Sequence, residues 1–316
     1  MARSHRLRPA ELLPWVAVTG AYFVFPEYLP LGSQIMIMIL FALSLDLILG
    51  YAGIITLGHS ALFGVGAYAA GIYALHVCEP ISGLIVAAAA AGVVGFVSGV
   101  VILRTHGLTL LMLTLSIVFL LHEIANKAGF ITGGADGLQG IAMREVLETF
   151  RFDMFGRTGY VYAAIVLFLI WLFARLLVHS PFGRSLTGIR ENVTRMHAIG
   201  SPVRRRLVTI YTISAMMAGI AGGLLTQTTQ FVGLNVLSFE RSGEIVIMLI
   251  LGGIGRLYGA FVGASVYMIA QDELAKIEPV FWYFWIGLLL VLIVMFARGG
   301  ILGLVDQALR RLRRKP

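Results

Sequence analysis

Long apolar stretches separated by short polar ones run through most of the chain. A membrane-spanning helix needs about 20 apolar residues. Segments that meet this need are 12–30, 33–51, 54–77, 81–103, 107–126, 160–178, 208–231, 242–271 and 280–298. The gaps at 30–33, 51–54 and 103–107 are short enough for tight turns, whereas 127–159 is a longer polar loop of mixed charge. The pattern predicts an all-α, polytopic membrane bundle.

Basic residues orient this bundle, because cytoplasmic loops carry an excess of Lys and Arg. The arginines in 1–8, in the loop 179–207 and in the tail 310–316 place all three stretches in the cytoplasm, with 127–159 outside. An even number of crossings must then follow the basic loop. We expect 242–271 to be two short spans broken at GGIGRLYG (252–259), which gives about ten crossings, six before the loop and four after.

Composition supports a single membrane domain over residues 1–316. The chain is 59% hydrophobic and 13% charged, whereas soluble domains are about a quarter charged. One cysteine, Cys78, excludes an intrachain disulfide. The basic and then apolar start could be a signal peptide, but Pro14 interrupts it and no clear cleavage site follows, so we expect a retained first helix. The basic loops account for the pI of about 9.9 and imply no nucleic-acid partner.

The basic loop contains an amphipathic helix. Ser180-Pro181 is a typical N-cap followed by proline in the first turn, and Gly200-Ser201-Pro202 marks the end. Apolar residues recur at spacings of three and four, on one face, at Phe182, Leu186, Ile189, Val193 and Met196. Arginines lie off that face, and Glu191 and Arg195 form a favourable i,i+4 pair. Such a helix either rests on anionic lipid or docks its apolar face into a groove of a cytoplasmic partner.

HSPFGRSLTGIRENVTRMHAIG (179–200) resembles the cytoplasmic loop of permease subunits of ABC importers for branched-chain amino acids. GYAGIITLGHSALFGVGAYAAG (50–71) resembles the most distinctive motif of the LivM branch. ITGGADGLQGI (131–141), MMAGIAGGLLTQ (216–227) and IVIMLILGGIGRLYGAFVGA (245–264) resemble further family segments, in order.

The resemblance implies ten helices in two inverted halves, with a cytoplasmic coupling helix between the sixth and seventh. It implies a second permease of the LivH type, two ATPase subunits of the LivG and LivF types, and an external substrate-binding protein. ATP and Mg²⁺ would be held by those ATPases. The residues that would contact an ATPase are Phe182, Gly183, Arg184, Leu186, Ile189, Arg190, Glu191, Val193, Arg195 and Met196.

The sequence contains no motif for nucleotide binding, catalysis or metal binding. No G-x-x-x-x-G-K-[ST] P-loop occurs. There is also no H-E-x-x-H, no nucleophile elbow and no Cys/His cluster with metal spacing. We therefore expect a transport subunit without a bound cofactor or metal, not an enzyme.

Two glycine-rich segments are candidates for the transport path. Gly58, Gly64 and Gly66 belong to the first and Gly252, Gly253 and Gly255 to the second. Small residues often only allow close helix packing. Short, glycine-interrupted segments in matching positions of two halves, however, point to a transporter's central site.

Polar residues within the spans have two interpretations each. His59 and Ser60, near the cytoplasmic start of their span, either stabilise the glycine-rich turn through a backbone carbonyl or contact substrate. Asp46 is either a polar group of the path or a hydrogen-bond anchor between helices.

The expected function is inward transport of leucine, isoleucine or valine across the bacterial inner membrane, powered by separate ATPases. Permeases for urea or short amides are close alternatives. An ion-coupled secondary transporter, with Asp46, His59 and Glu123 as relay, is the alternative from another class.

Overall fold

The computed structural model describes residues 13–141, 143, 156–277, 279, 281–296 and 299–304. Within these ranges the chain is helical, apart from loops and one antiparallel bridge between Leu138 and Val232. The helices are α1 (Leu13–Val24), α2 (Leu29–Asp46), α3 (His59–Ala74), α4 (Pro80–Ile102), α5 (Leu108–Lys127), α6 (Gly129–Thr132), α7 (Arg157–His179), α8 (Pro181–Glu191), α9 (Val193–Ala198), α10 (Val203–Thr229), α11 (Phe239–Gly252), α12 (Leu257–Ile277) and α13 (Trp282–Phe296). A π-helical turn, η3 (Leu47–Tyr51), extends α2, and 3-10 turns lie at Pro26–Tyr28 (η2), Gly134–Asp136 (η4) and Leu234–Leu237 (η5). The all-α class is confirmed.

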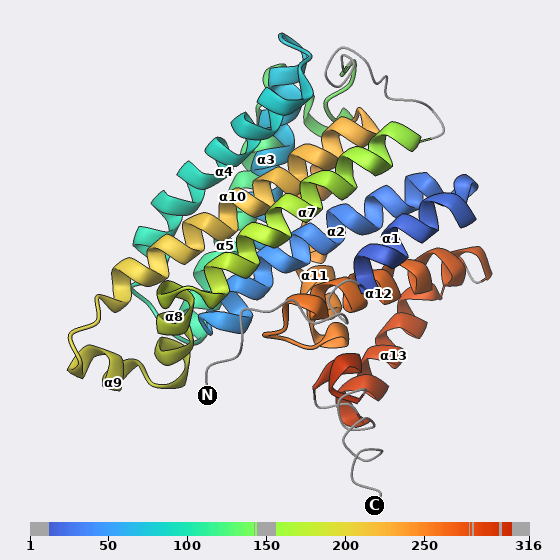
Figure 1. The fold of residues 1–316 in the computed structure, drawn as a ribbon. Coiled ribbons are helices and arrows are strands. Elements are labelled where there is room, and N and C mark those ends of the chain that lie inside the picture. Colours follow the sequence, from blue (N-terminus) through green and yellow to red (C-terminus); the bar gives the residue numbers. More distant parts are fainter. Residues whose placement is uncertain are drawn as a thin grey trace, which may run out of the picture.

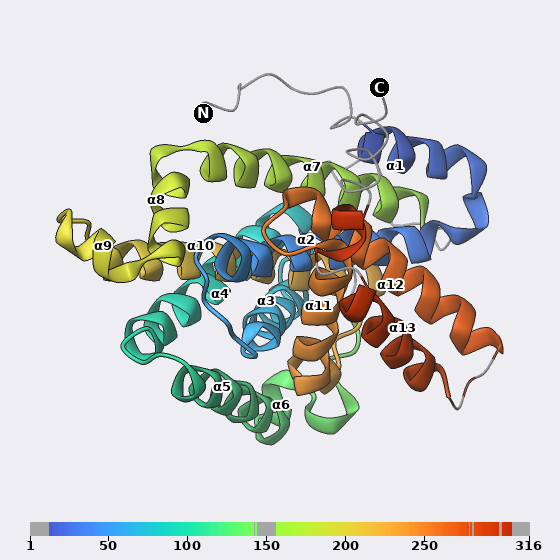
Figure 2. The same ribbon diagram turned by 90° about the horizontal axis from the view of Figure 1, so that it is seen from below.

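The centre of the bundle is α2, packed among α7, α10, α11 and α12 (Figure 1). Every residue from Met36 to Asp46 is buried, as expected for a helix that is apolar on all sides. Small residues of α10 let it approach α3 and α4 closely. Viewed along a perpendicular direction, α1 and α7 lie on one side of this centre and α5 and α6 on the other (Figure 2).

The order of helices agrees with the expected order of spans. Five helical segments are long and apolar enough to cross a membrane: Pro26–Tyr51, α4, α5, α7 and α10. α11 and α12 pass the same test as a pair and bend by 114°, so 242–271 is broken where GGIGRLYG predicts. α1, α3 and α13 are shorter, with 12, 16 and 15 residues. The relation of two inverted halves stays a prediction.

The expected helix over 54–77 is wrong at its start, because residues 52–58 are not helical and α3 begins only at His59. Gly53 has φ of 75°, a conformation that glycine adopts readily and that ends a helix. The amide of Ile54 then donates back to the carbonyl of Ile48 at 2.9 Å. We call residues 52–58 the unwound segment.

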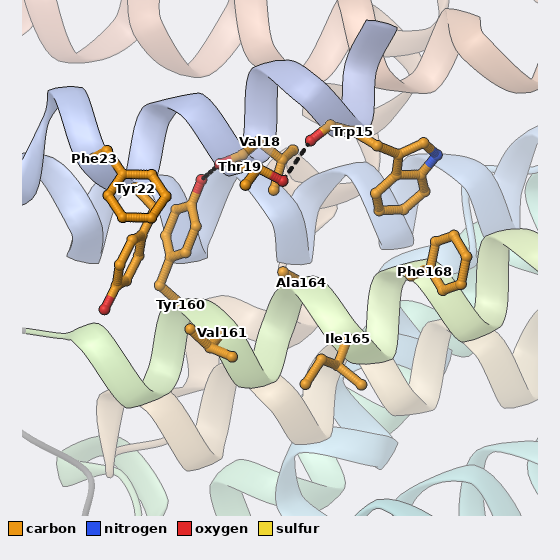
Figure 3. Close-up of a pocket in the computed structure, with 10 residues that line it drawn as sticks. All are labelled: Trp15, Val18, Thr19, Tyr22, Phe23, Tyr160, Val161, Ala164, Ile165 and Phe168. Atoms are coloured by element: carbon orange, nitrogen blue, oxygen red, sulfur yellow. Dashed lines mark hydrogen bonds between the residues drawn. The ribbon is translucent and has the colours of Figure 1, made fainter. Parts of the chain in front are cut away.

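An apolar groove of about 370 Å³ lies between α1 and α7 (Figure 3). The hydroxyl of Tyr160 donates to the carbonyl of Val18 at 2.7 Å and ties the two helices together. Thr19 bonds within its own helix, to the carbonyl of Trp15. The lining contains no carboxylate, imidazole or ammonium group, so this groove is not the candidate site for a charged ligand.

Candidate functional site

The basic loop folds as two helices, not one. Ser180 caps α8 by accepting a hydrogen bond from the amide of Gly183 at 3.2 Å. α8 ends at Glu191, and Asn192 adopts an extended conformation and caps α9 by accepting from the amide of Arg195 at 2.8 Å. The expected single helix is therefore wrong beyond Glu191, and the i,i+4 geometry for Glu191 and Arg195 is lost.

The apolar face of α8 is used within this chain. Leu186 and Ile189 are 2% and 1% exposed, and Gly183 is buried beside them. Helix α8 packs against α7, α10 and η3. The expectation that this apolar face fills a partner's groove is therefore wrong for these residues, because the bundle itself covers them.

A different surface of α8 and α9 remains open. Phe182 and Met196 are half-buried, and Met196 folds back over Gly188. The exposed members of the predicted coupling set are Arg184, Arg190, Glu191, Val193 and Arg195. This open surface is charged, with Val193 contributing an apolar side chain that is 43% exposed.

Arg190 differs from the other arginines because its head group points into the bundle. Its Nη1 donates to the carbonyl of Gly50. A methyl group added at Gly53 would lie 2.9 Å from Cγ of Arg190, and one added at Gly255 would lie 3.2 Å from Nη1. Arg190 thus connects α8 to the end of η3, to the unwound segment and to the break between α11 and α12.

Asp46 lies at the same junction and is fully buried. Its Oδ1 accepts a hydrogen bond from the amide of Gly255 at 2.7 Å. Its Oδ2 has no partner among the described residues. The anchoring role considered for Asp46 has a specific partner, an amide of the second glycine-rich break. We call Asp46, Arg190, Gly50 and Gly255 the junction.

The second break depends on glycine. Gly253 and Gly255 have φ of 111° and 77°, and residues other than glycine rarely adopt such values. Side chains at Gly252 would collide with the carbonyl of Gly259 across the bend. Gly255 lies against Gly50, which precedes the first glycine-rich segment, so a pairing of the two predicted segments stays a prediction.

His59 and Ser60 are buried where α3 begins, 1% and 0% exposed. Nε2 of His59 lies 2.8 Å from Oγ of Ser44. That hydroxyl already donates to the carbonyl of Phe41, so it accepts from His59. Nδ1 then lacks a partner among the described residues. The partner of His59 is thus a side chain, not the backbone carbonyl that we expected.

Ser60 links α3 to α11. Its amide donates to Oγ of Ser242 at 3.1 Å, and the Ser242 hydroxyl donates to Oγ of Ser60 at 2.6 Å. Together with His59, this pair joins the start of α3 to α2 and α11. Both residues are enclosed by protein in this structure, and neither faces an open space.

The glycines of the first segment bring helices together. A side chain at Gly66 would collide with the backbone of Gly219 in α10, and one at Gly64 with Leu237. At Gly58 a methyl group would lie 2.9 Å from the carbonyl oxygen of Thr114. Close packing explains all three in this structure.

Sequence reasoning missed the polar partners of these residues. Ser44, Ser242 and Thr114 are buried and bond to the region around α3. Small polar residues in apolar spans are a signal for such interhelical bonds, and they could have been considered with His59. Within the described ranges, no three His, Cys, Asp or Glu side chains come together as a metal site would require.

Comparisons with known proteins identify the family of this chain. Residues 29–296 match the family described as branched-chain amino acid transport system / permease component. The chain is 27% identical to the high-affinity branched-chain amino acid permease LivM of Escherichia coli K12 over 93% of this chain and 74% of that protein. It is 28% identical to LivM of Salmonella typhimurium with the same coverage. A probable LivM of Methanocaldococcus jannaschii is 27% identical over 83% of this chain and 89% of that protein. No solved structure matches. The chain belongs to the branched-chain amino acid transport permease family of multi-pass membrane proteins.

Proposed function

We propose that this chain is one permease subunit of an ATP-driven importer that carries leucine, isoleucine or valine into the cell. It would pair with a LivH-type permease, receive substrate from an external binding protein, and dock LivG- and LivF-type ATPases on α8 and α9. The α8 side of the bundle would then face the cytoplasm, in keeping with its arginines. ATP and Mg²⁺ would be bound by the ATPases alone.

The observation that carries this proposal is that the arginines of α8 and α9 differ in their contacts with the bundle. All three arginines Arg184, Arg190 and Arg195 are exposed, but the head group of Arg190 also donates to the carbonyl of Gly50 at the junction. Leu186 and Ile189 fix α8 to the bundle. A unit anchored on one side and charged on the other suits transmission of force from a docked partner.

The first experiment is co-purification of the ATPases with this chain in mild detergent. We expect Arg184→Glu or Arg195→Glu to remove the ATPases from the complex, because each reverses a charge on the open surface. ATP-dependent uptake of leucine should fall in parallel.

Arg104→Glu is the matched control. Arg104 is also exposed and lies at the end of α4, outside α8 and α9, so its reversal should leave the ATPases bound. If all three variants retain the ATPases, α8 and α9 are not the docking site. If wild type takes up leucine without ATP, the importer assignment itself is wrong.

A further inference from the structure

The unwound segment runs from Arg190 of α8, beside Gly53, to the interior of α5, beside Leu57. At its far end the amide of Leu57 donates to Oγ1 of Thr114 at 3.3 Å. Thr114 lies six residues inside α5, which begins at Leu108, so this contact is about 9 Å along the helix. Gly53 and Ile55 are exposed, and the Ile55 side chain is 60% accessible.

Lipid cannot satisfy this backbone. The amide of the exposed residue Ile55 donates to no group among the described residues. An unpaired backbone group in hydrocarbon costs several kcal/mol, and non-helical backbone at membrane depth therefore occurs where protein covers it or where it borders water. This face of the bundle must meet something other than lipid.

Helix α8 contacts the same unwound segment. Arg190 packs against Gly53 at one end, and Thr114 contacts Leu57 and Gly58 at the other. A displacement of α8 would therefore reach these residues first. Backbone that bonds to neighbours only at its ends is also easier to move than a helix with all its bonds internal.

We propose that the unwound segment lines a water-filled transport path, with Ile55 as the side chain that contacts the transported molecule. The inference rests on the proposed function. It places the path at the exposed unwound segment and not at the candidates His59, Ser60, Gly64 and Gly66, which are buried. The apolar side chain of Ile55 and its unpaired amide suit a small zwitterion with an aliphatic side chain.

Thiol accessibility tests this placement in membrane vesicles that contain the complete transporter. The single native cysteine is first removed as Cys78→Ser, which keeps a donor for the carbonyl of Ala74. Ile55→Cys is then treated with a water-soluble, charged methanethiosulfonate reagent. Phe173→Cys is the matched control, since Phe173 is 46% exposed and lies six residues from the end of α7. Helix α7 lies across the bundle from α5 (Figure 2).

We expect Ile55→Cys to react at least about tenfold faster than Phe173→Cys, because a thiol in lipid remains protonated and unreactive. Leucine at saturating concentration should slow that reaction, and modification should stop leucine uptake. Equal inertness of the two variants would overturn the inference. So would an Ile55→Cys thiol that reacts only when the second permease is absent, because the segment would then be a subunit interface.

The same vesicles separate this inference from the proposed function. A reactive, leucine-protected Ile55→Cys in a protein whose uptake needs no ATP would retain the path and reject the importer. ATP-dependent uptake with an unreactive Ile55→Cys would retain the importer assignment and reject the path at the unwound segment.

Discussion

Single residues matter here mainly through buried polar contacts that join distant parts of the chain. Asp46 is separated from Gly255 by most of the sequence, yet its carboxylate binds that amide at 2.7 Å. His59 bonds to Ser44, and Ser60 to Ser242. In an apolar bundle such groups stay buried only when they are paired, so each pair fixes one relative position of two helices.

Replacement of Asp46 tests the value of the junction. Asp46→Leu leaves the amide of Gly255 without an acceptor and should lower the free energy of unfolding by about 1–3 kcal/mol. Asp46→Asn keeps a carbonyl oxygen for that amide and should cost less. Thermal melting of the detergent-solubilised protein measures both.

Asp272→Asn is the control for loss of a charge. Asp272 pairs with Lys276 near the surface, where an ion pair is worth about 0–1 kcal/mol, so its replacement should scarcely change melting. Equal losses in Asp46→Asn and Asp46→Leu would show that the charge of Asp46, and not the hydrogen bond to Gly255, stabilises the junction.

Helices of this protein pack through glycine and alanine, which sets how closely they approach. In the contact of α3 with α10, Gly66 faces Gly219 backbone to backbone, and Gly219 in turn faces Ala87 and Ala91 of α4. Three helices thus share one line of small residues. Without a hydrophobic force between helices in lipid, this close packing is a main source of attraction.

Gly66→Ala adds only one methyl group but should markedly lower the stability of the folded protein. The added methyl would collide with backbone that cannot move aside, and overpacking of this kind costs about 1–3 kcal/mol. Gly243→Ala in α11 is the matched substitution, because nothing lies within 4 Å of its added methyl. Folded yield after solubilisation compares them, and equal yields would contradict the packing argument.

Some element boundaries could be predicted from the sequence and others could not. The break at Gly253 and Gly255 carries its own signal, since consecutive glycines end helices. Asn192 is a favoured N-cap residue, and that signal was available but overlooked within an otherwise periodic helix. The sequence predicts a turn at the start of the unwound segment, around Gly53, but not its extension to residue 58, because Ile54, Ile55 and Leu57 are as apolar as a span. Tertiary bonds to Ile48 and Thr114 determine its path.

On the scale of the whole molecule, the helices before the basic loop pack closely against those after it, and buried polar contacts join the two sets. The Ser60–Ser242 pair connects α3 with α11, and the junction connects α2 with the α11–α12 break. Alternating access by rocking of two halves requires such contacts to change.

A disulfide at this contact tests whether α3 and α11 move relative to each other. In a Cys78→Ser background, Ser60→Cys with Ser242→Cys should cross-link on oxidation, since the two Oγ atoms are 2.6 Å apart. Uptake should stop on oxidation and return with reductant, while Ser60→Cys alone should be insensitive. Unchanged uptake in the cross-linked protein would mean that the two helices move as one body.

The shortness of α3 also bears on how the protein is made. Its 16 residues are fewer than the roughly 20 that enter a bilayer unaided, and it carries a histidine at its start. Its partner α10 begins at Val203, so at about 5–20 residues per second it emerges on the order of ten seconds after α3. During that interval α3 is retained mainly by α4, with smaller contacts to α2, α5 and α6. Biogenesis should therefore be most vulnerable there, and ribosome stalling before residue 203 should leave α3 open to extraction from the membrane.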